Sequence, residues 1–276
     1  MGIKRWLEHP LTQGLDLDDP RTTHLRRRIL EENRFLRRIY EEWYRGLAAA
    51  LPPGEGPVLE LGSGAGFLAE VIPGLVRSEV FYRPGIDAVL DGLALPFAAG
   101  SLRGVVMTNV LHHLPRPVQF FHEAARCVRT GGVVAMVEPW VTPWSRFVYG
   151  RLHHEPFLPE AKEWEIPAGG PLSGANDALP WILFHRDRER FEREAPEWRI
   201  RSIEPIMPFR YLASGGISLR PLMPAAAYPL WKGFERALHP WRHRLAMFAA
   251  VVLERRLSSA ASTARAGPGA KRASTA

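Results

Sequence analysis

An apolar run that leads directly into three alternating glycines most constrains what this chain can fold into. Residues 58–61 read Val-Leu-Glu-Leu, a pattern typical of a strand buried in a parallel sheet. Gly62, Gly64 and Gly66 let the backbone turn sharply and approach a ligand, because they carry no Cβ. Residues 67–72 then predict a short helix whose N-terminus points at that ligand. The spacing is G-x-G-x-G, so an ordinary strand-to-helix turn is the alternative interpretation.

Strand and helix signals continue to alternate beyond this turn. Residues 78–81 and 104–109 predict further strands, and a helix over 118–128 precedes an apolar strand at 133–139. Such alternation is typical of a parallel sheet with helices on both faces. Glu79 lies near the end of the second strand, about 20 residues past the glycine turn, where this architecture holds ribose hydroxyls.

Four motifs in this order resemble the class I S-adenosylmethionine-dependent methyltransferases. They read ELGSGAG at 60–66, DGLALPF at 91–97, NVLHHL at 109–114, and RTGG at 129–132 with Glu138-Pro139 downstream. The resemblance covers residues 55–140 and is closest to the small-molecule and lipid branch, with its methyltransferase-11-like core. It implies a Rossmann-like, doubly wound α/β fold with a mostly parallel seven-stranded sheet, S-adenosylmethionine as the cofactor, and transfer of its methyl group.

The resemblance also implies which residues hold the cofactor. The three glycines would face its methionine part, Glu79 would hold the ribose, and Asp91 would hold the adenine amino group. The backbone around Asn109 would line the same pocket. The full set of expected cofactor contacts is Glu60, Gly62, Ser63, Gly64, Gly66, Glu79, Asp91, Gly92 and Asn109. A plain turn aspartate is the alternative for Asp91, and the sequence predicts no metal site.

The chain of 276 residues is long enough for one large α/β domain, expected over residues 1–257. Residues 1–54 are expected to form a helical extension, residues 55–140 the cofactor-binding core, and residues 258–276 a disordered tail. In the extension, apolar residues recur on one face of a single long helix: Leu25, Ile29, Leu36, Tyr40, Trp43 and Leu47. Its start is expected to be capped by Thr22 or Thr23. Tyr40 or Tyr44 is expected to touch the cofactor.

Residues 198–205 and 245–253 predict the sixth and seventh strands. The segments 141–196 and 207–243 are then insertions, expected to form a lid over the acceptor because they follow strand ends where ligands bind. The second insertion is apolar, broken by prolines and edged by cations. It therefore favours a lipophilic acceptor, such as a lipid or a quinone-like ring, and peripheral contact with a membrane. Packing of these apolar residues onto the core is the alternative.

An alcohol or phenol acceptor needs a general base, for which imidazole is the commonest group. His112 and His113 are the best-placed candidates, because they follow a strand beside the expected cofactor. Capping of the next helix is the alternative role for one of them. Other candidates for contacts with the acceptor lie in the first insertion: His153, His154, Glu155, Asn176, Asp177, His185, Arg186 and Asp187. A carbon acceptor in an activated ring would need no dedicated base.

Composition excludes several other classes. The net charge is +7, but Arg265, Lys271 and Arg272 in the tail supply three of these charges, which leaves +4. The sequence contains no stripe of Lys and Arg residues interleaved with aromatic residues, so nucleic acid is not an expected partner. A lone Cys127 suits a reducing cytoplasm, where we expect the protein, and is interpreted as a small buried residue. No secretory signal follows Met1.

Two other functions stay open. The chain is alternatively a catalytically silent module that binds S-adenosylmethionine as a sensor or partner-binding unit, or a transferase of a group other than methyl. Glu60, Glu79 and Asp91 argue against a silent copy, which would have no need of them. A dehydrogenase is disfavoured because its glycine spacing differs.

Overall fold

The computed structural model describes residues 9–11, 20–152, 155–166 and 174–257. The expected disordered tail at 258–276, and the candidate residues His153 and His154, lie outside the described residues.

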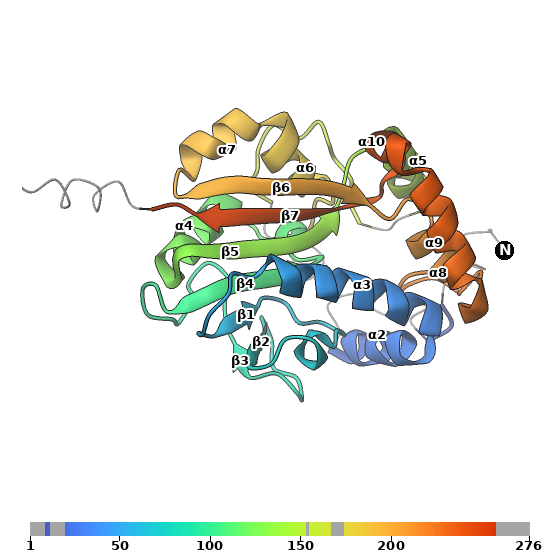
Figure 1. The fold of residues 1–276 in the computed structure, drawn as a ribbon, viewed down its shortest axis with the longest axis horizontal. Coiled ribbons are helices and arrows are strands. Elements are labelled where there is room, and N and C mark those ends of the chain that lie inside the picture. The colour runs from blue at the N-terminus through green and yellow to red at the C-terminus, as the bar shows by residue number, and fades with distance from the viewer. Residues whose placement is uncertain (1–8, 12–19, 153–154, 167–173, 258–276) are drawn as a thin grey trace, which may run out of the picture.

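A seven-stranded sheet with the order β3-β2-β1-β4-β5-β7-β6 forms the centre of the fold (Figure 1). Its strands are β1 (Val58–Glu60), β2 (Leu75–Glu79), β3 (Ala88–Val89), β4 (Leu102–Thr108), β5 (Val128–Pro139), β6 (Trp198–Ile206) and β7 (Phe248–Arg255). Pairing is parallel from β3 to β5, whereas β7 is antiparallel to both β5 and β6. The predicted Rossmann-like, mostly parallel sheet is therefore confirmed. The chain reverses its direction of winding between β1 and β4, which is where such sheets bind ligands.

Alternate residues of the central strands pack into two separate cores. Val58 and Val106 face α3 (Arg34–Ala50), while Leu59 and Val105 face α4 (Pro117–Cys127) on the other side. This alternation follows from the two-residue period of a strand. All four of these residues are buried, so the sheet is covered on both faces.

The connection between β1 and β2 is shorter than the sequence predicts. Instead of a helix over 67–72, it contains only the 3-10 turn η1 (Leu68–Glu70). The N-terminal helix α3 covers this face instead, with Tyr44 packed edge-to-face on Phe67 at a centroid distance of 4.9 Å. Pro73 and Gly74 follow the turn, and neither residue favours continuation of a helix.

The predicted long N-terminal helix is two helices, α2 (Pro20–Glu32) and α3, separated at Asn33. The Asn33 side chain accepts the Leu36 N–H at 3.0 Å and caps α3, so a new helix begins there. Thr22 and Thr23 lie inside α2 and are not its cap, contrary to the prediction. The packing face was predicted correctly in α3, where Leu36, Tyr40, Trp43 and Leu47 are all buried.

The two expected insertions differ in where they pack. The first contains α5 (Pro143–Leu152), α6 (Leu179–Trp181), η3 (Ile182–Arg186) and α7 (Arg188–Glu194). Phe184 and Phe191 contact Phe121 of α4 at centroid distances of 6.0 and 5.1 Å, so η3 and α7 belong to the core layer and not to a lid. The second contains α8 (Arg210–Ser214), η4 (Ala225–Ala227), α9 (Tyr228–Ala237), η5 (His239–Trp241) and α10 (Arg242–Leu245). These elements lie beside α5 at one end of the sheet (Figure 1).

Candidate active site

A cavity of about 600 Å³ lies where β1, β2 and β4 end. This volume is in the range of pockets that bind small molecules and cofactors. Every residue expected from the sequence to hold the cofactor or act on the acceptor lines it: Glu60, Gly62, Ser63, Gly64, Gly66, Glu79, Asp91, Gly92, Asn109, His112 and His113. Tyr40 and Tyr44 of α3 line it as well. Of the other acceptor candidates that the structure describes, Glu155 and Asp177 line the cavity. The rest are not among the lining residues: Asn176, His185, Arg186 and Asp187.

The glycine turn needs glycine for two structural reasons. Gly62 has φ of 65°, in the left-handed region, and a Cβ there would lie 2.7 Å from Val110 Cγ2. At Gly66 a Cβ would press on the Tyr44 hydroxyl and lie 3.0 Å from the Ser63 carbonyl oxygen. The turn therefore fits tightly between the β4 end and α3, with its backbone at the cavity wall.

Hydrogen bonds connect the glycine turn to the end of β2. Ser63 N–H donates to the Ser78 carbonyl at 2.9 Å, and the Ser78 hydroxyl donates to the Glu60 carbonyl at 2.7 Å. The Gly64 N–H donates to the Glu79 carboxylate. Burial raises the pKa of Glu79 above its ordinary value, although the Gly64 hydrogen bond opposes that rise. Burial also raises the pKa of Glu60 to about 7.

Buried polar atoms at the end of β4 can accept hydrogen bonds from a ligand in the cavity. Asn109 has a left-handed φ of 56°, and its N–H donates to the Val137 carbonyl at 2.9 Å. Within the described residues, Asn109 Oδ1 and Thr108 Oγ1 are buried and have no hydrogen-bond partner. Buried polar groups of this kind normally have partners, so a polar ligand such as S-adenosylmethionine fits this end of the cavity.

Asp91 has the hydrogen bond expected of a turn aspartate and also lines the cavity. Its Oδ1 accepts the Leu93 N–H at 2.8 Å. The residue is exposed, and it is one of the residues that form the cavity wall.

The other end of the cavity holds a cluster of histidines and carboxylates. Nδ1 of His112 lies 2.7 Å from Glu138 Oε2, while Glu138 Oε1 accepts the N–H groups of Val110 and Leu111 at 2.8 and 2.9 Å. Burial alone would lower the pKa of His112, but Glu138 outweighs it and, with Glu155 and Asp177, raises that pKa well above its usual value. Glu138 thus holds both the loop backbone and the imidazole.

His113 lies against His112 at a ring-centroid distance of 4.2 Å. Its Nδ1 is 3.2 Å from the Gly174 carbonyl oxygen, and its Nε2 is 4.0 Å from Glu155 Oε2. Burial, reinforced by His112, lowers the pKa of His113 to about 4. Neither histidine caps α4, whose N-cap is Arg116 with no side-chain cap, so the capping interpretation is wrong.

Sequence reasoning missed several lining residues. Thr108, Tyr149 and Tyr211 line the cavity, and Tyr149 donates its hydroxyl to the Met247 carbonyl at 2.9 Å. Thr108 has a usable signal in the sequence, since it is the last residue of a strand that ends at the ligand edge. The two tyrosines come from the insertions and are placed only by tertiary packing.

Comparison with known proteins agrees with this geometry. Residues 59–136 match the family model described as "Methyltransferase domain". The chain carries a class I S-adenosylmethionine-dependent methyltransferase domain. The methyltransferase domain thus includes the glycine turn, Asp91, the two histidines and most of β5.

Curated relatives of the methyltransferase domain carry the same description. The uncharacterized methyltransferase Rv0224c of Mycobacterium tuberculosis (strain H37Rv) is 29% identical over 158 residues, which cover 46% of this chain and 62% of that protein. The uncharacterized methyltransferase ML2584 of Mycobacterium leprae (strain TN) is 25% identical over 157 residues, which cover 46% and 58%. The chain therefore spans about three fifths of the length of the relatives it matches.

A solved structure shows that the fold extends beyond the matched segment. Geranyl diphosphate C-methyltransferase from Streptomyces coelicolor A3(2) aligns with a TM-score of 0.50 at 13% identity, covering 91% of this chain and 90% of that chain. The likeness therefore includes β6, β7 and the helices around them.

Proposed function

We propose that this protein transfers a methyl group from S-adenosylmethionine to a small lipophilic acceptor. The observation that carries the proposal is one cavity lined by two chemically different groups of residues. The first group is the glycine turn with Glu79 and Asp91, and the second is His112 with His113. Bound S-adenosylmethionine supplies an activated methyl group on a sulfonium, and the protein contributes alignment of the acceptor with it.

In this proposal Glu79 holds the ribose hydroxyls, Asp91 the adenine amino group, and the glycine turn the methionine part. The buried Asn109 Oδ1 and Thr108 Oγ1 accept further hydrogen bonds from the bound ligand. Glu60, Ser63 and Gly92 complete the wall. These assignments follow the resemblance of the sequence motifs to the methyltransferase family, and they are supported by the presence of all these residues in the cavity wall.

His112 and His113 are the proposed catalytic residues. An alcohol or phenol loses its proton as its oxygen takes the methyl group, and imidazole commonly handles such a proton. Apolar side chains from α5, the second insertion and β7 also line the cavity: Val148, Leu212, Ile217, Leu219 and Phe248. An apolar wall with a few convergent polar groups suits a lipid or quinone-like acceptor.

Calorimetric titration with S-adenosylmethionine and S-adenosylhomocysteine tests the cofactor site. We expect micromolar binding, about −8 kcal/mol. Glu79→Ala and Asp91→Ala are each expected to weaken it roughly 10- to 100-fold, because each removes a hydrogen bond to a charged group. Glu55→Ala, a change at an exposed site distant from the cavity, serves as the matched control and should bind normally.

The outcome of this titration separates the proposed functions. Absence of binding by folded wild type contradicts the methyltransferase proposal. Binding without S-adenosylhomocysteine formation, across a panel of phenolic, quinol and lipid acceptors, supports the silent sensor. Mass analysis of any product shows whether the transferred group is methyl.

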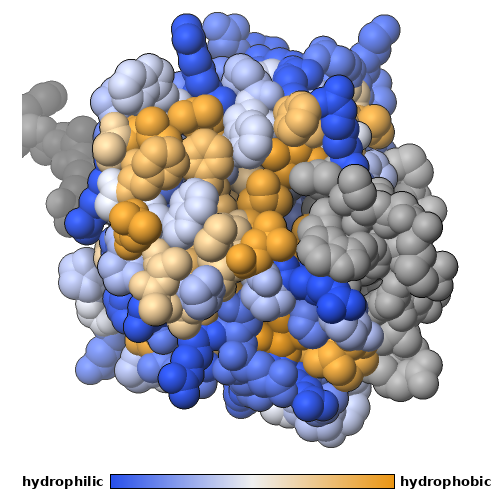
Figure 2. Space-filling model, turned by 90° about the vertical axis from the view of Figure 1, so that its right-hand side faces the viewer, coloured by the Kyte–Doolittle hydropathy of each residue, from blue (hydrophilic) through white to orange (hydrophobic). Residues whose placement is uncertain are grey.

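An exposed aromatic surface supports the lipophilic acceptor and contact with a membrane. Rings follow one another from α5 to α9 with centroid distances of 5.4–6.0 Å: Phe147, Trp144, Phe209, Phe234 and Trp231. Leu230 is 76% exposed and Trp241 is 53% exposed beside them. Figure 2 shows apolar side chains gathered on this face. The neighbouring Arg236, His243 and Arg244 are exposed, so the surface suits an anionic bilayer.

Sedimentation with phosphatidylcholine vesicles, with and without phosphatidylglycerol, tests this contact. Wild type is expected to bind the anionic vesicles, and Leu230→Asn with Trp241→Asn is expected to reduce binding roughly tenfold through lost burial of apolar area. Tyr82→Asn removes an equally exposed ring (75%) from the β2–β3 connection and should have no effect. Equal binding by all three proteins contradicts the proposed surface. No helix of the described residues is long and apolar enough to cross a bilayer.

A further inference from the structure

We propose that His112, His113, Glu155 and Asp177 form a binding site for one divalent first-row transition-metal ion. The four side chains come from two segments, the β4–α4 loop and the first insertion, which meet at the acceptor end of the cavity. The sequence predicted no metal site, because no metal-ligand motif spans such distant positions.

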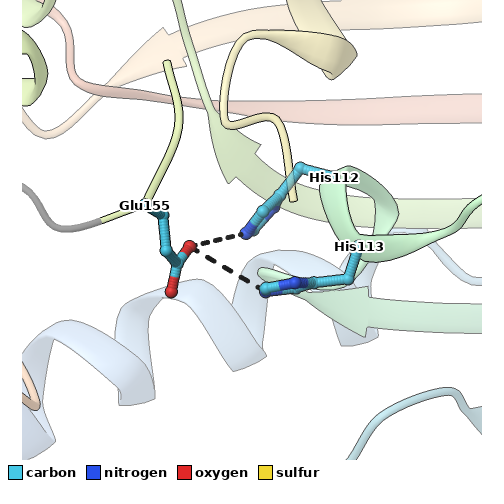
Figure 3. A group of neighbouring side chains, drawn as sticks. All are labelled: His112, His113 and Glu155. Atoms are coloured by element: carbon cyan, nitrogen blue, oxygen red, sulfur yellow. Dashed lines mark ion pairs between the residues drawn. The ribbon is translucent and has the colours of Figure 1, made fainter. Parts of the chain in front are cut away.

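The distances between the donor atoms suit a single ion. Glu155 Oε2 lies 3.5 Å from His112 Nε2 and 4.0 Å from His113 Nε2 (Figure 3). Asp177 Oδ1 also lies 3.5 Å from His112 Nε2. Ligands at roughly 2.0–2.2 Å from a metal lie about 3–3.6 Å from one another in tetrahedral or octahedral geometry. The donor atoms of His112, His113 and Glu155 all lie within 4.8 Å of one another, so the wider separations must shorten when an ion binds.

Both imidazoles are already oriented as metal ligands. His112 Nδ1 lies 2.7 Å from the Glu138 carboxylate and His113 Nδ1 lies 3.2 Å from the Gly174 carbonyl, so each Nδ1 donates its proton to an acceptor. Each Nε2 therefore faces Glu155, and an ion that binds there takes the place of the Nε2 proton of His112. Metal-binding histidines in proteins show this same arrangement, with the second ring nitrogen donating to a carboxylate or a carbonyl.

The backbone holds the two segments together independently of any ion. Asn176 N–H donates to the His112 carbonyl at 2.9 Å, and Asp177 N–H donates to the Pro156 carbonyl at 2.9 Å. The side chains of His112 and Asp177 are almost fully buried, at 3% and 0% exposed. Because the site is preorganised in this way, binding of an ion costs little conformational entropy.

The donor set indicates which ions bind. Two imidazoles with two carboxylates suit Zn²⁺, Fe²⁺ and Co²⁺ better than Mg²⁺, which prefers oxygen ligands and keeps several waters. Glu155 and His113 are 13% and 17% exposed, and both line the cavity. The ion would therefore have an open position toward the acceptor, as catalytic metal sites do.

The role of the ion rests on the proposed function. An acceptor hydroxyl bound at the open position loses its proton to solvent more readily, because the ion stabilises the alkoxide. The oxygen then forms a bond to the methyl carbon while the carbon–sulfur bond breaks, and the electron pair stays on sulfur. With the ion bound, the two histidines hold the ion and do not take the proton themselves, so they act on the acceptor through the ion.

Titration of untagged, chelator-treated full-length protein with Co²⁺, without S-adenosylmethionine, tests the site. Visible absorption is expected to saturate at one equivalent, to be lost on addition of Zn²⁺, and to be unaffected by Mg²⁺. His113→Gln and Glu155→Gln are each expected to weaken Co²⁺ binding at least tenfold. His122→Gln and Glu160→Gln, exposed on α4 and in the first insertion, are the matched controls and should bind normally.

Two results would overturn the site: no saturable absorption in the wild type, or wild-type affinity in both ligand variants. Circular dichroism identifies a variant that fails to fold, and the remaining ligand variant then decides. Because the titration contains no methyl donor, failure of the metal site leaves the result on S-adenosylmethionine binding unaffected. Metal binding without methyl transfer contradicts only the proposed function.

Discussion

Replacement of Glu138 by alanine is expected to reduce the free energy of unfolding by about 3–5 kcal/mol. The side chain is fully buried and is the acceptor for three donors: the backbone N–H groups of Val110 and Leu111, and Nδ1 of His112. Truncation leaves all three buried and unpaired, and each such group costs roughly 1–3 kcal/mol. Urea denaturation at neutral pH measures the change.

Two variants provide controls for Glu138→Ala. Glu138→Gln keeps a carbonyl oxygen for the two N–H groups and replaces the carboxylate oxygen beside His112 Nδ1 with an amide group, so we expect a smaller loss than with alanine. Glu160→Ala, whose side chain is 82% exposed, should stay within about 0.5 kcal/mol of wild type. Equal stability of Glu138→Ala and Glu160→Ala would show that the buried contacts contribute nothing.

Replacement of Arg210 by methionine is the second change with a large expected effect, again about 3–5 kcal/mol. Arg210 is almost fully buried at the start of α8. Its Nε donates to Glu235 at 2.5 Å, and its Nη1 donates to Glu42 of α3 at 3.0 Å and to the Tyr228 hydroxyl at 2.8 Å. The guanidinium links α8 to α3 and α9, so its removal leaves Glu42 and Glu235 without the cation that they share.

A double-mutant cycle separates the charge from the packing. Glu235 Oε1 also accepts the N–H groups of Phe209 and Arg210 at 2.8 and 2.7 Å, and Glu235→Gln keeps that acceptor. The double variant of Arg210→Met with Glu235→Gln is therefore expected to be more stable than Arg210→Met alone. If the loss of unfolding free energy in the double variant equals the sum of the losses in the two single variants, the two residues do not interact energetically.

The Arg210 variant also has an expected effect on ligands. Tyr211 and Leu212 follow Arg210 in α8 and line the cavity, so loosening α8 should weaken ligand binding in the cavity. From the sequence, Lys232 and Arg236 were interpreted only as cations that flank the apolar residues of the second insertion. In the structure Lys232 pairs with Glu42, whereas Arg236 is exposed.

The sequence by itself determined the glycine turn and the residues proposed to hold the cofactor. Gly62 adopts a left-handed φ beside Val110. The glycine that this conformation needs is visible in the sequence alone. Buried strands need apolar residues at alternating or continuous positions, and the order of such segments selects the parallel sheet. Glu79 and Asp91 follow strands, so their place at the ligand edge was also predictable.

Only the tertiary structure decided the acceptor end. Glu138, Glu155 and Asp177 meet His112 although they are distant from it in sequence, and only the packing of the first insertion brings them together. The break at Asn33 and the replacement of the β1–β2 helix by α3 were likewise not predictable. Local patterns report backbone geometry and burial, whereas the partners of a buried charge depend on which distant segments fold against each other.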